Sequence, residues 1–547
     1  MEGNANNSDL AALAGLSPFE LKDRLISLAS SERDRLMLNA GRGNPNFLAT
    51  LPRRAFLALG DFAVSESERS YSYLDSGFGG LPERDGMLGR FNAFVVQDPQ
   101  RGGLSFLRSA LSYVHDQLGL DREEFLAEMV TAFLGCFYPT PPRVLPRTEE
   151  VLRAYLTQEL FGPRPPAGTF DVFPTEGGTA AMAYLFSSLA ANGLIAPGDR
   201  IALAVPIFSP YLEIPVLPEY GLETVLLRMD EAEDWRLPDS ELDKLLDPAI
   251  KVFCLVNPSN PPSSRQPGEV LDRLARLVAE ERRDLIIITD DVYGTFADNY
   301  VSVFAACPRN TVCVYSFSKY FGATGWRLGT VALHRENVID ALLQDLPPDE
   351  KQRLDTRYAS LTTDAGQLAF MDRLVADSRT VALNHTAGLS GPQQLQMALF
   401  ALHGLMDRLH RYQDAAKDLI RDRYDTLYRS MGVPSVRGPD DVGYYSVIDL
   451  EELGGKLYGT QFRNWLASRT DLGLHFLLRL AAETGVVLLP GSGFDVSVPS
   501  ARVSLANLTD YEYRAIGTAT RRVVEEYYAM FRRGEPGGAG PAEGSNP

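Results

Sequence analysis

Cysteine and histidine are scarce in this sequence. Its 547 residues include four cysteines, at positions 136, 254, 307 and 313, and six histidines. No two cysteines form a CxxC pair, and no HExxH motif is present. Such sparse thiols argue against a disulfide scaffold or a structural zinc site, and they fit a reducing compartment. The sequence therefore predicts no metal site and a cytoplasmic location.

Positive charge is also in deficit. Lys and Arg number 53 against 71 Asp and Glu, which gives a net charge of −18. An acidic chain is a poor general binder of nucleic acid or of anionic membranes. No apolar run approaches the ~20 residues needed to span a bilayer, and the first residues lack the features of a signal peptide. We expect no nucleic-acid partner and no membrane attachment.

The sequence does contain ample material for a core. Hydrophobic residues make up 45% and charged residues 23%, which is typical of a globular protein. Ser17, with Glu20 three residues later, predicts the start of a helix. Further helices are predicted over 104–134 and 148–161, and the Gly-, Tyr- and Pro-rich residues 71–103 are predicted to form an ordered loop region.

Between residues 170 and 335, short β-rich runs alternate with helical stretches. This rhythm predicts βαβ units and a mostly parallel sheet buried on both faces. The predicted strands cover 169–174, 200–205, 223–227, 251–256, 285–289, 312–316 and 328–333, and helices are predicted over 178–191 and 267–280. Residues 336–430 look helical, 440–510 mix strand and helix, 510–533 form a final helix, and the tail is predicted to be disordered.

The most informative segment is SFSKYFGATGWRLG, in which a strand runs into a turn that presents Lys319. A lysine just past a buried strand is partly desolvated, which favours the neutral amine needed for Schiff-base chemistry. Ser316, Ser318 and Arg327 could bind an anion beside it, because a guanidinium matches phosphate geometry. Taken alone, Lys319 would more often be a surface lysine at a strand exit.

A second segment, LIIITDDVYG, ends an apolar run at Asp290 and places Tyr293 three residues later. A carboxylate at the carboxyl end of a parallel strand lies where open α/β sheets bind ligands. Asp290 could keep a pyridinium nitrogen protonated, and Tyr293 could donate to a ring hydroxyl. A helix cap, or a metal site made of Asp290 and Asp291, remains an alternative for this segment.

Three other strand ends carry weaker signals. CLVNPSNPPSS offers Asn257 and Asn260, although a plain turn explains such residues too. In FPTEGGTAAMAYLF, Gly178 and Thr179 open a helix whose backbone N–H groups could hold a phosphate. Phe208 follows a strand and could stack on a planar ring, or simply belong to the core.

Together these segments follow a specific order: GGT, an aromatic residue, NPxNP, Asp-x-x-Tyr, then SxSK with an arginine eight residues further on. This order resembles the aspartate-aminotransferase superfamily, the fold-type-I enzymes that depend on pyridoxal 5′-phosphate. The resemblance implies an α/β fold, with a mostly parallel sheet in a large domain and a smaller α+β domain.

A narrower resemblance extends over about residues 38–508. GRGNPNFLATLPRRAF, GFGGLP, NHTAGLSGPQQLQMALF and RVSLANL are similar to segments of the aspartate 4-decarboxylases, also called aspartate β-decarboxylases. A similar insertion over 336–395 makes those enzymes longer than ordinary aminotransferases. The resemblance implies conversion of L-aspartate to L-alanine and CO2, with aspartate aminotransferase as a side activity. An aminotransferase, or an enzyme for a modified aspartate, stays an alternative.

The resemblance assigns a role to each cofactor residue. Lys319 would form the Schiff base and move protons, and Asp290 would pair with the ring nitrogen. The other cofactor contacts would be Asn260 and Tyr293 to the ring oxygen, Phe208 to the ring face, and Gly178, Thr179, Ser316 and Arg327 to the phosphate.

On the substrate side, Arg502 in ARVSLANL matches the arginine that binds the α-carboxylate. Arg42 in GRGNP matches an arginine placed near the substrate, and Asn260 would also contact the substrate. Tyr138 in GCFYPT would reach the cofactor phosphate of a neighbouring subunit.

We predict an N-terminal helical arm (1–40), active-site loops with part of the small domain (41–110), the cofactor-binding domain (111–410), the rest of the small domain (411–533) and a disordered tail (534–547). The resemblance implies at least a homodimer and a larger homo-oligomer. A DNA-binding regulator of the same fold is disfavoured, because the chain is acidic and its 40-odd N-terminal residues leave no obvious room for a helix-turn-helix domain.

Overall fold

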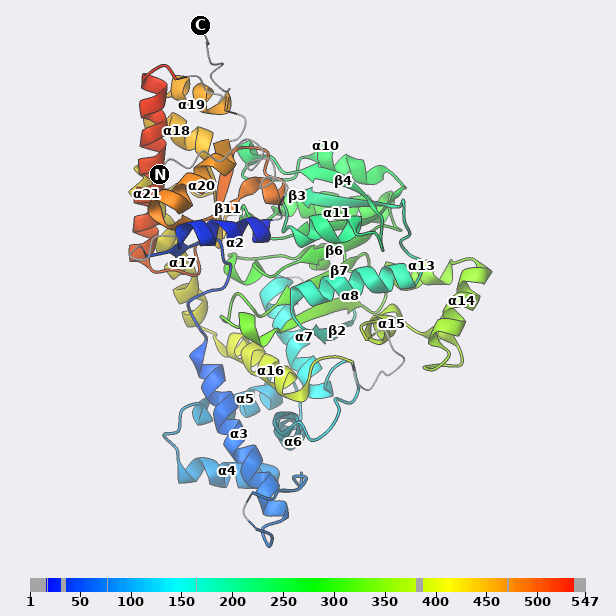
Figure 1. Cartoon of the computed structure of the whole chain (residues 1–547). Helices are drawn as coiled ribbons and strands as arrows, with labels where there is room; N and C mark the ends of the chain where they lie inside the picture. Colours follow the sequence, from blue (N-terminus) through cyan, green and yellow to red (C-terminus); the bar gives the residue numbers. More distant parts are fainter. Residues whose placement is uncertain are drawn as a thin grey trace.

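A seven-stranded sheet forms the centre of the molecule (Figure 1). The computed structural model describes residues 16, 18–30, 36–75, 77–163, 165–379, 387–469 and 472–535. The strand order is β2-β8-β7-β6-β5-β3-β4, and only β8 runs antiparallel to its neighbours. The strands are β2 (Phe170–Thr175), β3 (Arg200–Val205), β4 (Glu223–Arg228), β5 (Ile250–Val256), β6 (Ile286–Asp290), β7 (Thr311–Ser316) and β8 (Gly329–His334).

The apolar runs of these strands are explained by burial on both faces. In β3, Ile201, Leu203 and Val205 join one hydrophobic core, whereas Ala202 and Ala204 join a second core. The alternation follows the two-residue period of a strand. Helix α8 (Gly178–Ala191) packs on β2, β7 and β8, and α11 (Gly268–Glu280) buries its apolar stripe in the second core.

Helices surround this sheet on several sides. Figure 1 shows α3 to α6 gathered at the lower end of the molecule, next to α16. These and the other helices of the first 410 residues are α2 (Pro18–Ala29), α3 (Thr50–Ser70), α4 (Met87–Gln97), α5 (Leu104–Asp116), α6 (Arg122–Leu134), α7 (Pro146–Leu160), α9 (Pro210–Glu213), α10 (Asp239–Leu242), α12 (Val303–Ala306), α13 (Val338–Gln344), α14 (Pro348–Tyr358), α15 (Phe370–Asp377) and α16 (Gly391–Met406).

A second, smaller sheet lies beside the first, with order β11-β12-β9 (Figure 1). Two long helices, α17 and α21, pack along each other next to it. The elements of this region are α17 (Arg411–Met431), β9 (Tyr445–Asp449), α18 (Leu450–Tyr458), α19 (Thr460–Ala467), α20 (Leu472–Thr484), β11 (Leu489–Pro490), β12 (Ser500–Ser504) and α21 (Asp510–Arg532). The N-terminal segment joins it, because β1 (Leu38–Asn39) pairs with β10 (Val486–Val487).

Most predicted elements are observed within one or two residues of their expected bounds, and the 178–191 helix and the 200–205 strand match fully. The loop predicted over 71–103 is wrong in part, because α4 lies within it. Met87, Phe91 and Val95 recur every four residues and are buried, so a short apolar face outweighs the surrounding Gly and Pro residues. The predicted cap Ser17 and residues 536–547 of the predicted disordered tail lie outside the described residues.

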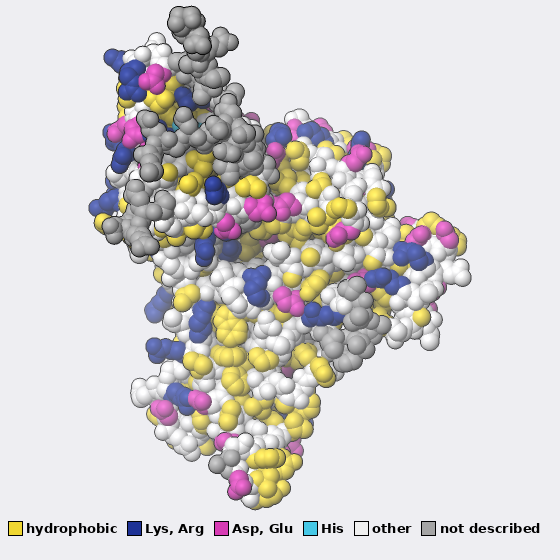
Figure 2. All heavy atoms as spheres, in the orientation of Figure 1, with side chains coloured by type: hydrophobic (Ala, Val, Ile, Leu, Met, Phe, Trp, Pro, Cys, Tyr) yellow, Lys and Arg dark blue, Asp and Glu magenta, His cyan; other side chains and the backbone are white. Residues whose placement is uncertain are grey.

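Exposed apolar side chains gather on the lower part of the molecule (Figure 2). Residues 48–81, in and next to α3, include nine exposed large apolar side chains: Leu48, Leu51, Leu57, Val64, Tyr71, Tyr73, Leu74, Phe78 and Leu81. Across the described residues, no helix combines the length and the apolar character needed to cross a membrane.

Candidate active site

One cavity of about 140 Å³ lies at the carboxyl ends of the central strands. Strands β5, β6 and β7 are parallel, so the loops that follow them meet at one edge of the sheet. Nine of the twelve predicted site residues line this cavity: Gly178, Thr179, Phe208, Asn260, Asp290, Tyr293, Ser316, Lys319 and Arg327. The remaining three are Arg502, Arg42 and Tyr138.

Asp290 is a buried carboxylate with few protein partners. Its oxygens accept hydrogen bonds from the Val292 N–H at 3.2 Å and the Tyr211 hydroxyl at 3.4 Å. Burial raises the pKa of Asp290 to about 7, although Lys319 acts to lower it. A protonated ring nitrogen would stabilise this carboxylate in its charged form.

The neighbouring carboxylate does not share this space. Asp291 accepts hydrogen bonds from the Thr289 hydroxyl at 2.6 Å and the Cys313 thiol at 3.4 Å, and it does not line the cavity. A metal site shared by Asp290 and Asp291 is therefore not supported. Asn257 also turns away, because its side-chain oxygen accepts the Gln266 N–H at 2.9 Å.

The opposite end of the cavity is built to receive an anion. Helix α8 begins there, so its first N–H groups face the cavity. Gly177 precedes it with a φ of 89°, and a Cβ at this position would lie only 2.4 Å from Arg327 Nη2. The Ser316 and Ser318 hydroxyls, 2.9 Å apart, lie in the same cradle. Only glycine leaves room for the Arg327 guanidinium here.

Lys319 lies between this anion cradle and the N-terminal loop. It follows β7, and its ammonium donates a hydrogen bond to the Gly43 carbonyl at 2.9 Å. The amine is thus held in the cavity by a backbone oxygen, and no carboxylate of the described residues pairs with it.

Arg502 on β12 is a buried cation without a counter-ion in the described part of the chain. Only 2% of its surface is exposed, and its Nε has no hydrogen-bond partner. It donates to the Gly41 carbonyl at 2.7 Å and to Asn260 Oδ1 at 3.1 Å. Its guanidinium lies between the rings of Tyr445 at 4.4 Å and Phe494 at 4.6 Å. A buried charge of this kind calls for an anionic partner.

Arg42 and Tyr138 do not line the cavity. Arg42 is exposed, in the loop whose Gly41 and Gly43 carbonyls hold Arg502 and Lys319. Tyr138 is 67% exposed, and its predicted contact with a neighbouring subunit stays a prediction.

Sequence reasoning missed two tyrosines. Tyr211 donates to Asp290, and Tyr445 lines the cavity although its segment, YYSVIDL, predicted only a strand. The sequence gives no clear sign of either role, since Tyr445 is about 126 residues from Lys319 and is brought to it by the small sheet.

These residues fit pyridoxal phosphate, the cofactor that the resemblance implies. An amine for the aldehyde, a carboxylate for the ring nitrogen and an anion cradle for the phosphate converge on one cavity. Phe208, which is half-buried, offers an aromatic face in the same space. The cofactor explains why these side chains lie together without a metal ion.

The family model described as "Aminotransferase class I and II" matches residues 169–517. The chain belongs to this family. The matched span begins one residue before β2 and contains all nine cavity-lining residues predicted for the site, together with Arg502. Outside it lie the loop that carries Arg42 and the helices α2 to α7.

One relative is similar over nearly its whole length. A Pseudomonas protein described as a bifunctional aspartate aminotransferase and L-aspartate beta-decarboxylase is 55% identical over 526 residues, which cover 96% of this chain and 99% of the relative. The aspartate/prephenate aminotransferase of Thermus thermophilus is 28% identical over 192 residues, covering 35% of this chain and 46% of that protein.

Solved structures of aminotransferases share the fold. Thermus thermophilus aspartate aminotransferase with maleate has a TM-score of 0.57 at 17% identity, covering 95% of this chain and 99% of that one. A Pyrococcus protein, titled protein-A1, has a TM-score of 0.58 at 18% identity over 95% and 99% of the two chains. The central sheet and its helices are therefore those of the aminotransferase fold.

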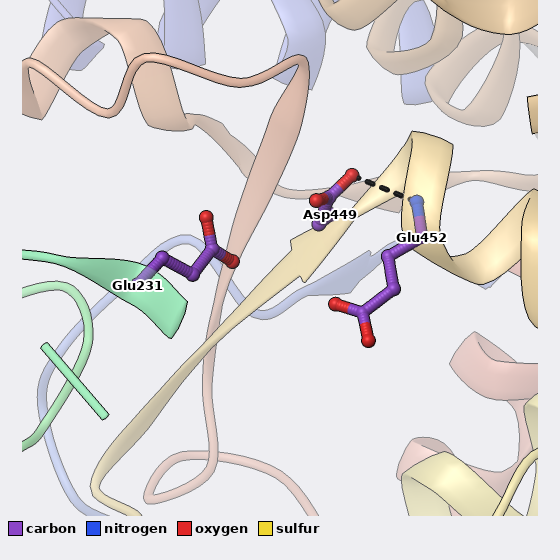
Figure 3. Close-up of side chains that lie close together, drawn as sticks. All are labelled: Glu231, Asp449 and Glu452. Atoms are coloured by element: carbon purple, nitrogen blue, oxygen red, sulfur yellow. Dashed lines mark hydrogen bonds between the residues drawn. The ribbon is translucent and has the colours of Figure 1, made fainter. Parts of the chain in front are cut away.

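Away from the cavity, three carboxylates gather where the two sheets approach each other (Figure 3). Glu231 follows β4, Asp449 ends β9 and Glu452 lies on α18. Asp449 caps α18 by accepting the Glu452 N–H at 3.0 Å, and Glu452 pairs with Lys456 at 2.7 Å. Helix capping explains the position of Asp449, and the ion pair explains that of Glu452. We therefore do not assign a metal site to these three carboxylates.

Replacing Glu231 with glutamine is expected to stabilise the protein at high pH. Burial raises the pKa of Glu231 to about 7, and Asp449 and Glu452 contribute in the same direction. Because this pKa lies above the ordinary value, the folded protein favours the neutral form of Glu231. The contribution of that neutral carboxyl to the stability of the fold is fully present below about pH 4.5 and is lost as the pH rises through 7. The midpoint temperature of thermal unfolding should be roughly 1–2 °C higher for the variant than for the parent at pH 8, and the two should not differ at pH 5. Equal shifts at both pH values would contradict this explanation.

Proposed function

We propose that this chain is a pyridoxal-phosphate enzyme that converts L-aspartate to L-alanine and CO2, with aspartate aminotransferase as a side activity. The similarity to a bifunctional relative across nearly both full lengths carries this proposal. Geometry supports an amino-acid substrate independently, because Arg502, a buried cation without a counter-ion, contacts Asn260 at the rim of the cavity that holds Lys319.

Each residue has a separate task in this reaction. Arg502 binds the substrate α-carboxylate, which supplies the anion that its buried guanidinium lacks. Lys319 Nζ moves the proton at the substrate Cα, and Asp290 keeps the ring nitrogen protonated. Pyridoxal phosphate, when bound, supplies an electron sink for the bonds that break at the substrate.

Asn260 links cofactor and substrate. Its Oδ1 accepts from Arg502 at 3.1 Å, while its amide donates to the Tyr293 hydroxyl at 3.4 Å. The resemblance directs both Asn260 and Tyr293 to the ring oxygen. Asn260 would therefore fix the distance between the bound α-carboxylate and the ring, which is the positioning that such catalysis depends on.

We also propose that the enzyme is cytoplasmic and acts as at least a homodimer, within a larger homo-oligomer. The exposed apolar side chains of residues 48–81 support self-association, because large apolar side chains that gather on one part of a surface often mark an interface. In a dimer, Tyr138 of each protomer would contact the cofactor phosphate of the other.

The test is to incubate the purified protein with pyridoxal phosphate and L-aspartate, and to measure CO2 and amino-acid products together. Alanine and CO2 in equal amounts, formed without an added keto acid, support the proposal. Oxaloacetate formed only with a keto-acid acceptor would instead support an aminotransferase.

Replacing Arg42 with alanine should lower alanine formation more than transamination. The resemblance places Arg42 near the substrate, and the neighbouring Gly41 and Gly43 carbonyls hold Arg502 and Lys319, so we assign the second carboxylate to this cation. Arg42 should orient the side-chain carboxylate without strongly neutralising its charge. A cation that bound this leaving carboxylate tightly would stabilise the ground state more than the transition state and would slow the loss of CO2. We expect the ratio of alanine to keto acids to fall by roughly tenfold, about 1.4 kcal/mol.

The measurement is that ratio at equal aspartate saturation, with Arg24→Ala on α2 as the matched control. An unchanged ratio, with both products falling together, would assign Arg42 to general binding or folding.

A further inference from the structure

Tyr445, the first residue of β9, brings a phenol to the lysine of the active site. Its side chain is 2% exposed and lines the cavity that holds Lys319. A Cβ on Gly43 would lie 2.1 Å from Tyr445 Oη and 3.0 Å from Lys319 Nζ. The phenol and the amine therefore approach one point from two different sheets, and glycine leaves the space between them open.

Two cations surround this phenol. In the register of β9 and β12, Tyr445 lies opposite Ser504 and diagonally next to Arg502, whose guanidinium is 4.4 Å from its ring. Burial by itself raises the pKa of Tyr445, but the positive Lys319 and Arg502, together with hydrogen bonds from Tyr293 and Lys319, outweigh burial, and the pKa falls below its ordinary value. The pKa of Tyr293 and of Tyr444, in contrast, is raised well above the ordinary range.

Hydrogen bonds add to this polarisation. Arg502 donates to Asn260 at 3.1 Å, Asn260 donates to Tyr293 at 3.4 Å, and the Tyr293 hydroxyl donates to Tyr445 Oη at 3.1 Å. Each hydrogen bond in this series is donated in the direction of Tyr445, which favours the ionised form of its hydroxyl. The inference depends on the position of Tyr445 in the cavity and on its contact with Arg502, because Tyr293 is also the residue that would donate to the ring oxygen of a bound cofactor.

The proposed decarboxylation needs a proton that Lys319 does not hold. When CO2 leaves, the bond between the side-chain carboxylate and Cβ breaks, and its electron pair stays at Cβ. One proton must then be added there, so aspartate plus one proton gives alanine plus CO2. Lys319 would by this moment have moved the Cα proton to the bound cofactor, which leaves its amine neutral and leaves Arg502 as the cation beside Tyr445.

We propose that the Tyr445 hydroxyl is the acid that protonates the substrate Cβ after CO2 has left. This inference rests on the proposed decarboxylase function. Tyr445 loses its O–H proton to carbon, and the phenolate that remains is stabilised by Arg502. It regains a proton from solvent, which supplies the one proton consumed in each turnover. Asp290 is directed to the ring nitrogen, so it does not compete for this role.

The test compares Tyr445→Phe with the parent enzyme loaded with pyridoxal phosphate. Phenylalanine keeps the ring against Arg502 and removes only the hydroxyl. Because a positioned general acid contributes roughly 10²- to 10⁴-fold, alanine formation should fall by at least about 100-fold. Transamination of aspartate with a keto acid does not need this proton and should fall far less. Equal losses of both activities would assign Tyr445 to positioning of Arg502 and overturn the proposal.

Tyr444→Phe is the matched control. Its hydroxyl donates to the Gly43 carbonyl at 2.8 Å, yet Tyr444 does not line the cavity. Alanine formation should change by less than about tenfold in this variant. A loss as large as that of Tyr445→Phe would show that any hydroxyl near Gly43 supports the loop, and would also overturn the proposal.

A spectroscopic readout is independent of turnover. In the cofactor-free protein, ultraviolet titration of tyrosinate should show one tyrosine that ionises at lower pH than the others. This step should vanish in Tyr445→Phe and persist in Tyr444→Phe. A titration without an early step in the parent protein overturns the proposal even if Tyr445→Phe does not fold.

Failure of the proposed function has a different signature. If the parent enzyme forms no alanine from aspartate, the decarboxylase assignment is wrong whatever Tyr445 does. If the parent forms alanine and Tyr445→Phe forms it equally well, only the role of Tyr445 is wrong.

Discussion

Lys319→Ala is expected to abolish both alanine formation and transamination. The variant loses the amine that we propose to bond the cofactor and to move the Cα proton, and no other lysine of the described residues lines the cavity. We expect a decrease of roughly 10⁴-fold or more, because nucleophile and acid–base group are lost together. The measurement is the initial rate of both reactions, with Lys351→Ala on α14 as the control.

A second readout locates the covalent bond. The parent protein with pyridoxal phosphate should be yellow, and borohydride should fix the cofactor on Lys319. Peptide mapping that finds it on any other lysine would contradict the assignment of the whole SxSK segment. The control variant should remain yellow and be labelled at the same position.

Arg502→Ala is expected to impair every α-amino acid substrate. The side chain is buried between Tyr445 and Phe494 and has no carboxylate partner in the described chain, and we propose that the substrate supplies its anion. Loss of one partner of a desolvated charge pair costs about 2–5 kcal/mol. We expect kcat/KM for aspartate to fall by about 30- to 4,000-fold, mostly through KM.

The conservative variant Arg502→Lys separates charge from geometry. Lysine keeps the positive charge but cannot form two parallel hydrogen bonds to a carboxylate, so it should restore only part of the activity. Aspartate and a monocarboxylic amino acid should suffer alike in Arg502→Ala. If only dicarboxylic substrates suffered, the roles assigned to Arg502 and Arg42 would be reversed.

The central fold could be predicted from the sequence because its signals are local. Strands such as β3 are apolar runs buried on both faces, and α8 begins directly after a glycine pair. Short polar segments at the strand ends placed Asp290 and Lys319 at one edge of a parallel sheet, since that edge is where such strands all end. Local signals failed at α4, where three buried apolar residues outweigh the turn-forming residues around them.

The remote parts of the site could not be predicted in this way. Arg502 was identified through a resemblance, but its burial without a counter-ion is visible only in three dimensions. Nothing in YYSVIDL indicates that Tyr445 reaches Lys319, because that contact depends on how the small sheet packs against the large one. The same packing gathers Glu231, Asp449 and Glu452 from segments more than 200 residues apart.

The sequence by itself determined the parallel sheet, the order of the proposed cofactor residues and the glycine turn that opens α8. Each of these depends on hydrophobic periodicity or on residues a few positions apart, which the chain encodes directly. Tertiary structure alone decided that Tyr445 approaches Lys319 on one side and Arg502 on the other, that Asp291 turns away from Asp290, and that Gly43 leaves space between phenol and amine. These features arise from packing between distant segments, where burial and the field of neighbouring charges set the chemistry of a side chain.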